Sequence, residues 1–213
     1  MNLSKMKTAA LFLVALSLLF AGQSMAGVTK KSQSKSAKLQ QSYVWYDGEQ
    51  ERQVWLNPDL MAEFGAGKGS AAKSSVKSVY ADAVQVPKRF GSVNIWRLGA
   101  GTGSDAAIAK LSTAGQPGKY SPVLHDGPSS TGRMRALPGN IIVYLDPAWN
   151  NESVNAWAAG HQFEIVKKLE IGPNIYVIRT GPGLEALNIA NTLYKSGEVV
   201  AAFPDWWEEK TTR

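Results

Sequence analysis

Four short strand-like runs alternate with two segments of helical spacing between residues 137 and 207, and this order restricts the possible folds. The runs are wholly or partly apolar, and glycine or proline bounds most of them, as is typical of strands: residues 141–145, 162–168, 174–180 and 199–203. Apolar residues three and four positions apart give the helical spacing: Val154, Trp157 and Ala158, then Leu184, Leu187 and Ala190. The order predicts an α+β fold, a ferredoxin-like βαββαβ open sandwich.

The predicted sheet is apolar on both faces. Successive residues of a strand point to opposite faces, yet nearly every residue of 141–145 and 175–178 is apolar. An antiparallel sheet with one face in water should alternate apolar and polar residues. The two helices cover one face only. We therefore expect another body to cover the second face: the first half of the chain, a second copy of the chain, or a partner protein.

The first half of the chain repeats features of the second half in the same order. Four pairs of segments match: 54–58 with 143–147, 94–96 with 174–176, 108–109 with 189–190, and 111–116 with 193–198. This ordered match predicts two tandem related modules, residues 43–111 and residues 137–207. The segment 112–136 is rich in proline and glycine, and we expect it to be the linker between them.

The first module has one clear local signal. Asp47-Gly48 lies between residues 43–46 and 52–56, and this dipeptide between two strand-like runs predicts a β-hairpin. Residues 65–78 are rich in glycine, alanine, lysine and serine, which predicts a flexible insertion.

Residues 1–26 have the composition of a signal peptide. Lys5 and Lys7 precede an apolar run over 9–21, and Ala26 closes a short segment of small residues suited to cleavage. The run is shorter than the roughly 20 residues of a membrane span. We therefore expect export to the periplasm or the extracellular space, with no membrane attachment after cleavage. Residues 27–42 are rich in serine, glutamine and lysine and predict a disordered leader. Export disfavours a nucleic-acid partner.

Catalytic and cofactor chemistry has little support in the sequence. The chain has no cysteine, and its two histidines, His125 and His161, have no identifiable nucleophile or further metal ligand near them. Residues 65–70 resemble a phosphate loop but lack the serine or threonine after Lys68, and residues 99–103 lack the parallel βαβ context of a dinucleotide site. We expect no cofactor, no metal site and no catalytic residue.

The C-terminal end carries the most distinctive surface signal. Trp206 and Trp207 are adjacent and are followed by charged residues, a composition typical of interface anchors. The alternative is that both tryptophans fold back onto the sheet of their own chain. We expect residues 208–213 to form an extended tail.

The second half of the chain resembles the propeptides of subtilases, in particular the fervidolysin-like and I9-like prodomains. The resemblance lies in three segments, residues 137–145, 174–178 and 196–204, and in the segment 43–48 that precedes them. The chain is especially similar to the stand-alone external chaperones of secreted, kexin-like bacterial serine proteases. The catalytic motifs of a subtilase are absent from the sequence.

This resemblance implies an exported, non-catalytic chaperone and inhibitor of a subtilisin-like serine protease. The sheet face would dock on the enzyme, and the tail would fill the substrate cleft. The partner-binding residues implied are Tyr144, Tyr176, Phe203, Asp205, Trp206, Trp207, Glu208, Glu209, Lys210, Thr211, Thr212 and Arg213. Two other readings stay open: a detached or degenerate pro-region of a longer subtilase, and a ferredoxin-like cell-envelope binding module. The oligomeric state is not indicated by the sequence.

Overall fold

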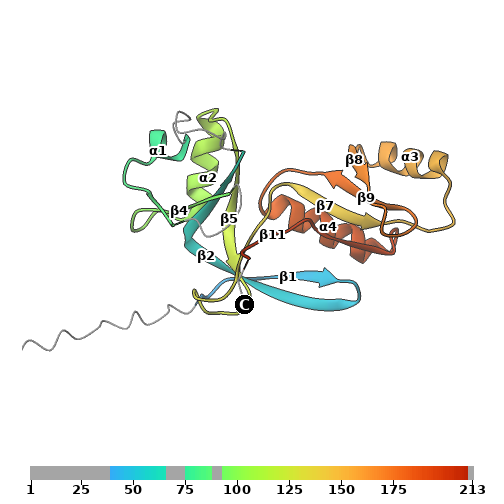
Figure 1. Ribbon diagram of the computed structural model, residues 1–213, viewed down its shortest axis with the longest axis horizontal. Coiled ribbons are helices and arrows are strands. Elements are labelled where there is room, and N and C mark those ends of the chain that lie inside the picture. The colour runs from blue at the N-terminus through green and yellow to red at the C-terminus, as the bar shows by residue number, and fades with distance from the viewer. Residues whose placement is uncertain (1–38, 66–74, 88–92, 211–213) are drawn as a thin grey trace, which may run out of the picture. The chain divides into compact units, whose positions relative to one another are not determined.

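The computed structural model describes residues 39–65, 75–87 and 93–210 (Figure 1). These residues belong to one compact unit, residues 35–213. The expected signal peptide, residues 27–38 of the expected leader, most of the expected insertion and residues 211–213 lie outside the described residues. None of the described helices has the length and apolarity that crossing a membrane requires.

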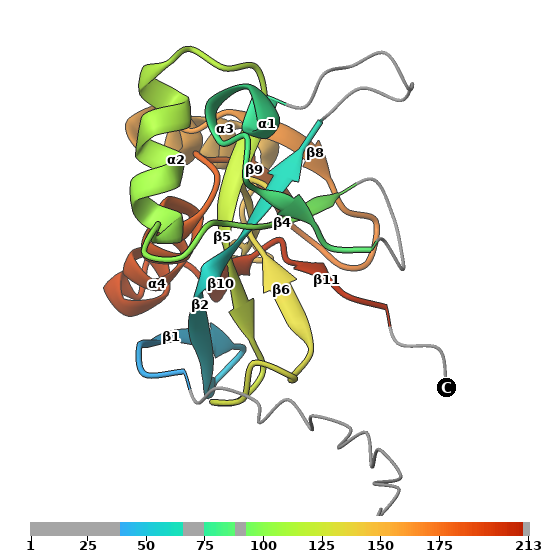
Figure 2. The same cartoon turned by 90° about the vertical axis from the view of Figure 1, so that its left-hand side faces the viewer.

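The first sheet contains seven strands in the order β11-β6-β5-β2-β4-β3, with β1 also paired to β2. Its elements are β1 (Ser42–Asp47), β2 (Gln50–Phe64), α1 (Ser75–Val79), β3 (Val84–Gln85), β4 (Asn94–Arg97), α2 (Ser104–Thr113), β5 (Lys119–His125), β6 (Met134–Ala136) and β11 (Trp207–Glu208). The expected hairpin at Asp47-Gly48 is confirmed: β1 and β2 pair antiparallel, and Gly48 has a φ of +61°. Figure 2 shows α2 lying along one side of this sheet.

The second sheet contains four antiparallel strands in the order β10-β7-β9-β8. Its elements are β7 (Asn140–Tyr144), α3 (Asn151–Gly160), β8 (Ile165–Lys168), β9 (Ile175–Arg179), α4 (Leu184–Ser196) and β10 (Ala201–Pro204). The side chain of Asn150 accepts a hydrogen bond from the Ser153 amide and caps α3, and Gly197 ends α4 in a left-handed conformation. The expected α+β class is confirmed by this mixture of antiparallel sheets and helices.

The segment 112–136, expected to be a linker, is corrected by the structure. It contains the end of α2 and the strands β5 and β6, and β5 pairs with β2 inside the first sheet. Pro122 made the segment look unlike a strand, because proline lacks the amide donor of a sheet ladder. In the structure Pro122 pairs with Met61 beside an irregularity of β2 between Asn57 and Met61, a place where sheets tolerate proline.

The first of the four matched pairs of segments is also corrected by strand register. The sequence match places Leu56 opposite Leu145, yet the two strands pair differently with their neighbours. Asn94 pairs with Glu63, whereas the Leu145 amide donates to the Asn174 carbonyl. The match of 54–58 with 143–147 and the match of 94–96 with 174–176 therefore do not agree in strand register.

One hydrophobic core joins elements of both sheets. It contains Trp45, Val54 and Leu124 from the first sheet together with residues of β7, β9, α3 and α4. The β1 strand packs on α4, where Tyr46 stacks on Tyr194 with ring centroids 4.3 Å apart. The Asn191 side chain donates a 2.8 Å hydrogen bond to the Val44 carbonyl. The two halves therefore share a core.

Candidate protein-binding site

The face of the second sheet that points away from α3 and α4 carries partly exposed apolar side chains. Directly paired residues of an antiparallel sheet point to the same face. Register therefore places Ile142, Val177 and Phe203 in one row, and Tyr144, Ile175 and Ala201 in the next. These six residues define the outer face. Ile142, Tyr144 and Phe203 are partly exposed, and the rings of Tyr144 and Phe203 meet edge to face at 5.6 Å.

The first half of the chain leaves part of this face in contact with solvent: Ile142, Tyr144 and Phe203 are partly exposed, whereas Ile175, Val177 and Ala201 are buried. The helix-covered face of the same sheet contains Ile141, Val143 and Ile178, all fully buried in the shared core. The outer face differs because three of its large apolar residues keep contact with solvent. Exposed apolar residues grouped on one sheet face are typical of protein-binding surfaces.

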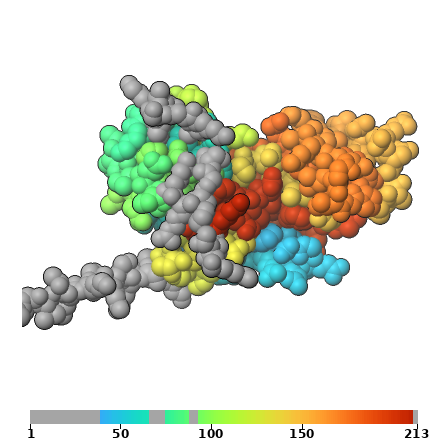
Figure 3. Space-filling view, viewed as in Figure 1, coloured from blue at the N-terminus to red at the C-terminus, as the bar shows by residue number. Residues whose placement is uncertain are grey.

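A cleft of about 700 Å³ opens beside the outer face and shares Ile142 and Phe203 with it. Its walls come from three parts of the chain that are distant in sequence. They are the β1–β2 hairpin with Trp45, Asp47, Arg52 and Gln53; the β5–β6 segment with Asp126, Gly127, Arg133 and Arg135; and the C-terminal segment with Pro204, Asp205, Trp206 and Glu208. Figure 3 shows the C-terminal segment, in red, reaching the surface of the molecule.

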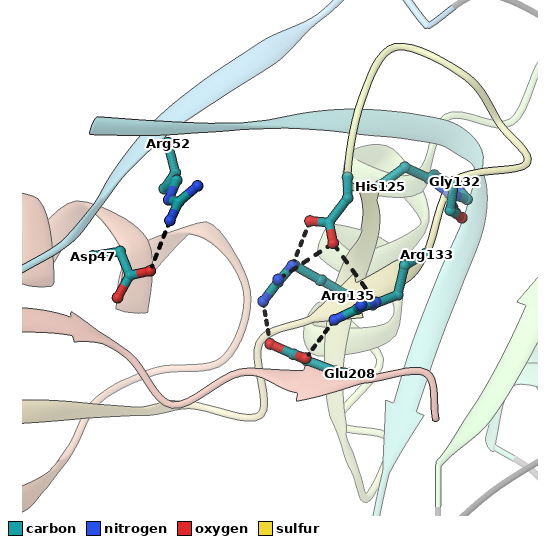
Figure 4. Close-up of polar contacts among 8 residues, drawn as sticks. Asp47, Arg52, His125, Gly132, Arg133, Arg135 and Glu208 are labelled. Atoms are coloured by element: carbon teal, nitrogen blue, oxygen red, sulfur yellow. Dashed lines mark hydrogen bonds and ion pairs between the residues drawn. The ribbon is translucent and has the colours of Figure 1, made fainter. Parts of the chain in front are cut away.

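Four charged side chains form a closed network in this cleft, which we call the arginine cluster: Asp126, Arg133, Arg135 and Glu208 (Figure 4). Arg135 binds Asp126 at 2.6 Å and also pairs with Glu208. Arg133 lies 3.2 Å from Glu208 and 3.8 Å from Asp126. Each carboxylate therefore contacts both guanidinium groups, so the four charges balance.

Two tryptophans flank the more buried arginine of the cluster. The Arg135 guanidinium lies 5.5 Å from the ring centre of Trp45 and 5.7 Å from that of Trp206, within the range of cation–π attraction. The two rings meet edge to face at 5.5 Å. The Arg135 side chain is only 11% exposed. Removal of Arg135 from water strengthens its pairing with the two carboxylates.

The C-terminal segment is held against the first sheet rather than extended into solvent. Trp207 pairs with Ala136 and Glu208 pairs with Arg135, which makes β11 the outermost strand. The Asp205 amide donates to the Asn140 carbonyl at 3.1 Å, and the Glu209 amide donates to the Met134 carbonyl at 2.9 Å. The fold-back alternative that the sequence left open for the tryptophans is therefore the observed arrangement, and the expected tail loses Glu208 to β11.

The expected binding residues lie in different parts of the molecule. Phe203 and Tyr144 lie together on the outer face, and Asp205, Trp206 and Glu208 line the cleft. Trp207 and Glu209 contact β6, and Lys210 is exposed. Thr211, Thr212 and Arg213 lie outside the described residues.

Tyr176 is a correction. It is 6% exposed, pairs with Val143 and belongs to the shared core, so it points to the helix-covered face. The sequence made both faces of β9 apolar, and that pattern does not reveal which face the helices cover.

Sequence reasoning missed Trp45, Asp126, Arg133 and Arg135. The last three were assigned to a linker. One available signal was the spacing of Arg133 and Arg135, since residues two apart in a strand share a face. Nothing in the local sequence indicates that Glu208, 73 residues after Arg135, completes the cluster.

His125 is the last residue of β5, directly before Asp126 of the cleft, and is almost fully buried. Its Nδ1 lies 2.7 Å from the Gly132 carbonyl oxygen, so Nδ1 carries the proton and donates. Its Nε2 then accepts a 3.1 Å hydrogen bond from the side-chain Nδ2 of Asn57. Burial lowers the pKa of His125, while the hydrogen bond to Gly132 and the nearby Glu209 and Asp126 carboxylates oppose that shift. The neutral imidazole is therefore a structural group that joins β5 to β2 and to the loop before Arg133.

Two further polar features lie away from the cleft. His161 is exposed and contacts Glu198 at 2.8 Å, at the end of α3. Glu63 is buried and accepts hydrogen bonds from Ser75 and Trp96. Among residues 39–65, 75–87 and 93–210, no group of three or more histidine, cysteine, aspartate or glutamate side chains is placed to hold a metal ion.

Comparisons of this chain with protein-family models, with curated proteins and with solved structures find no match.

Proposed function

We propose that this chain is an exported, non-catalytic chaperone and inhibitor of a subtilisin-like serine protease. In this proposal the outer face of the second sheet docks on the enzyme, and the C-terminal segment occupies the substrate cleft. The observation that carries the proposal is the group of three partly exposed apolar side chains, Ile142, Tyr144 and Phe203, on the outer face of a sheet whose other face is fully packed.

The propeptide resemblance implies a ferredoxin-like fold for residues 137–207, and the arrangement of the second sheet supports it. The elements follow the order βαββαβ, and the sheet order β10-β7-β9-β8 places the first and third strands in the centre. That strand order leaves both helices on one face and the other face available to a partner.

The tandem-module part of the proposal is supported by the order of strands in the first sheet. Its strands β5-β2-β4-β3 are connected by α1 and α2 in the same sequence of elements as β10-β7-β9-β8 with α3 and α4. In this interpretation β1, β6 and β11 are additions to the first module, and each of them contributes residues to the cleft. The first module thus extends to His125, beyond the expected end at residue 111.

A protein that binds the native protease more tightly than the unfolded protease stabilises the native state by mass action. A preformed docking face suits this role because the apolar area is already arranged before binding. The same docking places the C-terminal segment near the enzyme surface, where an extended chain pairs by main-chain hydrogen bonds.

The experiment that tests the proposal is inhibition of a panel of subtilisin- and kexin-like proteases by residues 27–213. We expect slow-dissociating inhibition of at least one enzyme. The variant Phe203→Glu places a charge on the outer face and is expected to weaken inhibition at least tenfold, because a buried unpaired charge is costly.

Val84→Glu is the matched control, because Val84 is a 60% exposed apolar residue on β3 of the first sheet. It makes the same kind of change away from the outer face and should inhibit like the unmodified protein. Equal loss of inhibition in both variants would contradict docking through the outer face. A stable homodimer that ignores every protease in the panel would contradict the proposed function and favour the envelope-module reading.

A further inference from the structure

We propose that the arginine cluster is a latch that holds residues 205–209 on the first sheet, and that this segment leaves β6 when the chain inhibits its protease. The inference rests on the proposed function, in which the C-terminal segment enters the substrate cleft. It adds a regulated step to that function: the inhibitory segment is withheld in the free protein.

The need for release follows from the hydrogen bonds of the segment. The backbone amides of Asp205 and Glu209 donate hydrogen bonds to the carbonyl oxygens of Asn140 and Met134 in the same chain. An extended peptide in a protease cleft uses such main-chain groups to pair with the enzyme. The same groups cannot serve both partners at once, so docking in the cleft requires the segment to detach.

The strand pairing alone is a weak attachment. Only Trp207 and Glu208 pair with β6, and β11 lies at the edge of the sheet. Two-residue pairings are far shorter than the strands of ordinary sheets. Trp206 packs on the shared core and Trp207 on a core cluster of the first sheet. The charged part of the attachment is Glu208, whose carboxylate contacts both Arg133 and Arg135. Charge-assisted hydrogen bonds of this kind are stronger than neutral ones.

The latched arrangement also contains features that favour release. Two buried polar atoms next to Asp205, the Trp206 Nε1 and the Asn140 Oδ1, have no hydrogen-bond partner among the described residues. Each regains water when the segment leaves, and this gain offsets part of the lost pairing. The cluster thus holds a segment whose attachment leaves two buried polar atoms unpaired, a cost that detachment relieves.

Two variants open the latch from opposite sides. Glu208→Gln removes the carboxylate charge from the segment, and Arg133→Gln removes one of its partners, directly before β6, without altering the segment. Arg133 is 45% exposed, so its replacement leaves the core intact. Glu209→Gln is the matched control, since it makes the same chemical change one residue away and outside the arginine cluster.

The first readout needs no protease: hydrogen–deuterium exchange of the Asp205 and Glu209 amides in the free, full-length mature protein. We expect exchange about tenfold faster in Glu208→Gln and Arg133→Gln, and little changed in Glu209→Gln. Unchanged exchange in the first two variants would overturn the latch, whatever the protease panel shows.

The second readout is the rate constant for association of the protein with a protease of the panel that the unmodified protein inhibits. The latch predicts faster association for both Glu208→Gln and Arg133→Gln. Faster exchange with unchanged association would overturn the release step while leaving the proposed function in place. A change in association for Glu208→Gln alone would mean that Glu208 contacts the enzyme, and would also overturn it. If the unmodified protein inhibits no protease, the proposed function fails, and the exchange readout still decides whether the cluster holds the segment.

Discussion

At the scale of single residues, burial determines which charged and polar side chains depend on partners within the protein rather than on water. Arg135 and His125 are adjacent to the same loop, and both are largely buried. The Arg135 guanidinium is paired with two carboxylates, Asp126 and Glu208. His125 has only neutral partners on both ring nitrogens, so its neutral form is favoured.

His125 leads to a prediction about pH. Burial lowers the pKa of His125 in the folded state, so the unfolded chain, with a histidine pKa of about 6.5, binds the proton more readily. The contribution of His125 to the free energy of unfolding is therefore expected to be fully present above about pH 6.5. It is lost as the pH falls through the folded-state pKa of His125. Urea unfolding at several pH values between 7.5 and 5 measures this dependence.

The variant His125→Gln should be less stable at pH 7.5 but lose less stability on acidification. His161→Gln is measured beside it, so that any contribution of the His161–Glu198 pair is separated from that of His125. If His125→Gln and the unmodified protein lose stability in parallel, another group is responsible.

Gly139 leads to a second prediction at the same scale. Its φ is +100°, and an added Cβ would lie 2.9 Å from both the Pro182 nitrogen and the Thr180 oxygen, which are backbone atoms. We expect Gly139→Ala to lower the free energy of unfolding by about 2 kcal/mol or more. Gly160→Ala, in α3 with open space around the glycine, should be neutral or slightly stabilising. Equal effects in the two variants, measured by urea unfolding, would contradict this account.

At the scale of elements, β5 is an inner strand of the first sheet whose sequence has the composition of a loop. Its burial pattern places six of its seven residues inside the protein, although Ser121 and Pro122 interrupt the apolar run. Ser121 has a structural role, because its hydroxyl accepts a hydrogen bond from the Leu137 amide at 3.0 Å. This bond ties the first sheet to the start of the second half.

The placement of β5 predicts a large effect at Leu124, which is fully buried in the shared core. Leu124→Ala is expected to cost about 2–5 kcal/mol of unfolding free energy, the usual range for a leucine truncated in a core. Val200→Ala is the control, because Val200 is 62% exposed, and a change below about 0.5 kcal/mol is expected there. A small effect at Leu124 would restore the linker interpretation of this segment.

At the scale of the whole described molecule, the shared core couples the two sheets. Trp45, Val54 and Leu124 pack with residues of α3, α4, β7 and β9, so neither sheet completes its core without the other. We expect one cooperative unfolding transition, with tryptophan fluorescence and far-ultraviolet circular dichroism changing together. Two separated transitions would mean that the halves fold independently.

The sequence alone determined the features that depend on short-range physics. Periodicity and bounding glycines and prolines predicted the strands and helices of the second half, and Asp47-Gly48 predicted the first hairpin. These signals are local, since a turn or an amphipathic helix is specified by residues a few positions apart.

Tertiary structure decided the features that depend on pairing across the chain. The strand β5 was found only through its partner β2, and the sides of Tyr144 and Tyr176 were settled only by where the helices pack. The arginine cluster joins residues 73 positions apart, so no local pattern encodes it. The physical reason is that burial and charge pairing depend on which distant segment supplies the neighbour, whereas alternation along a strand says only that two faces exist.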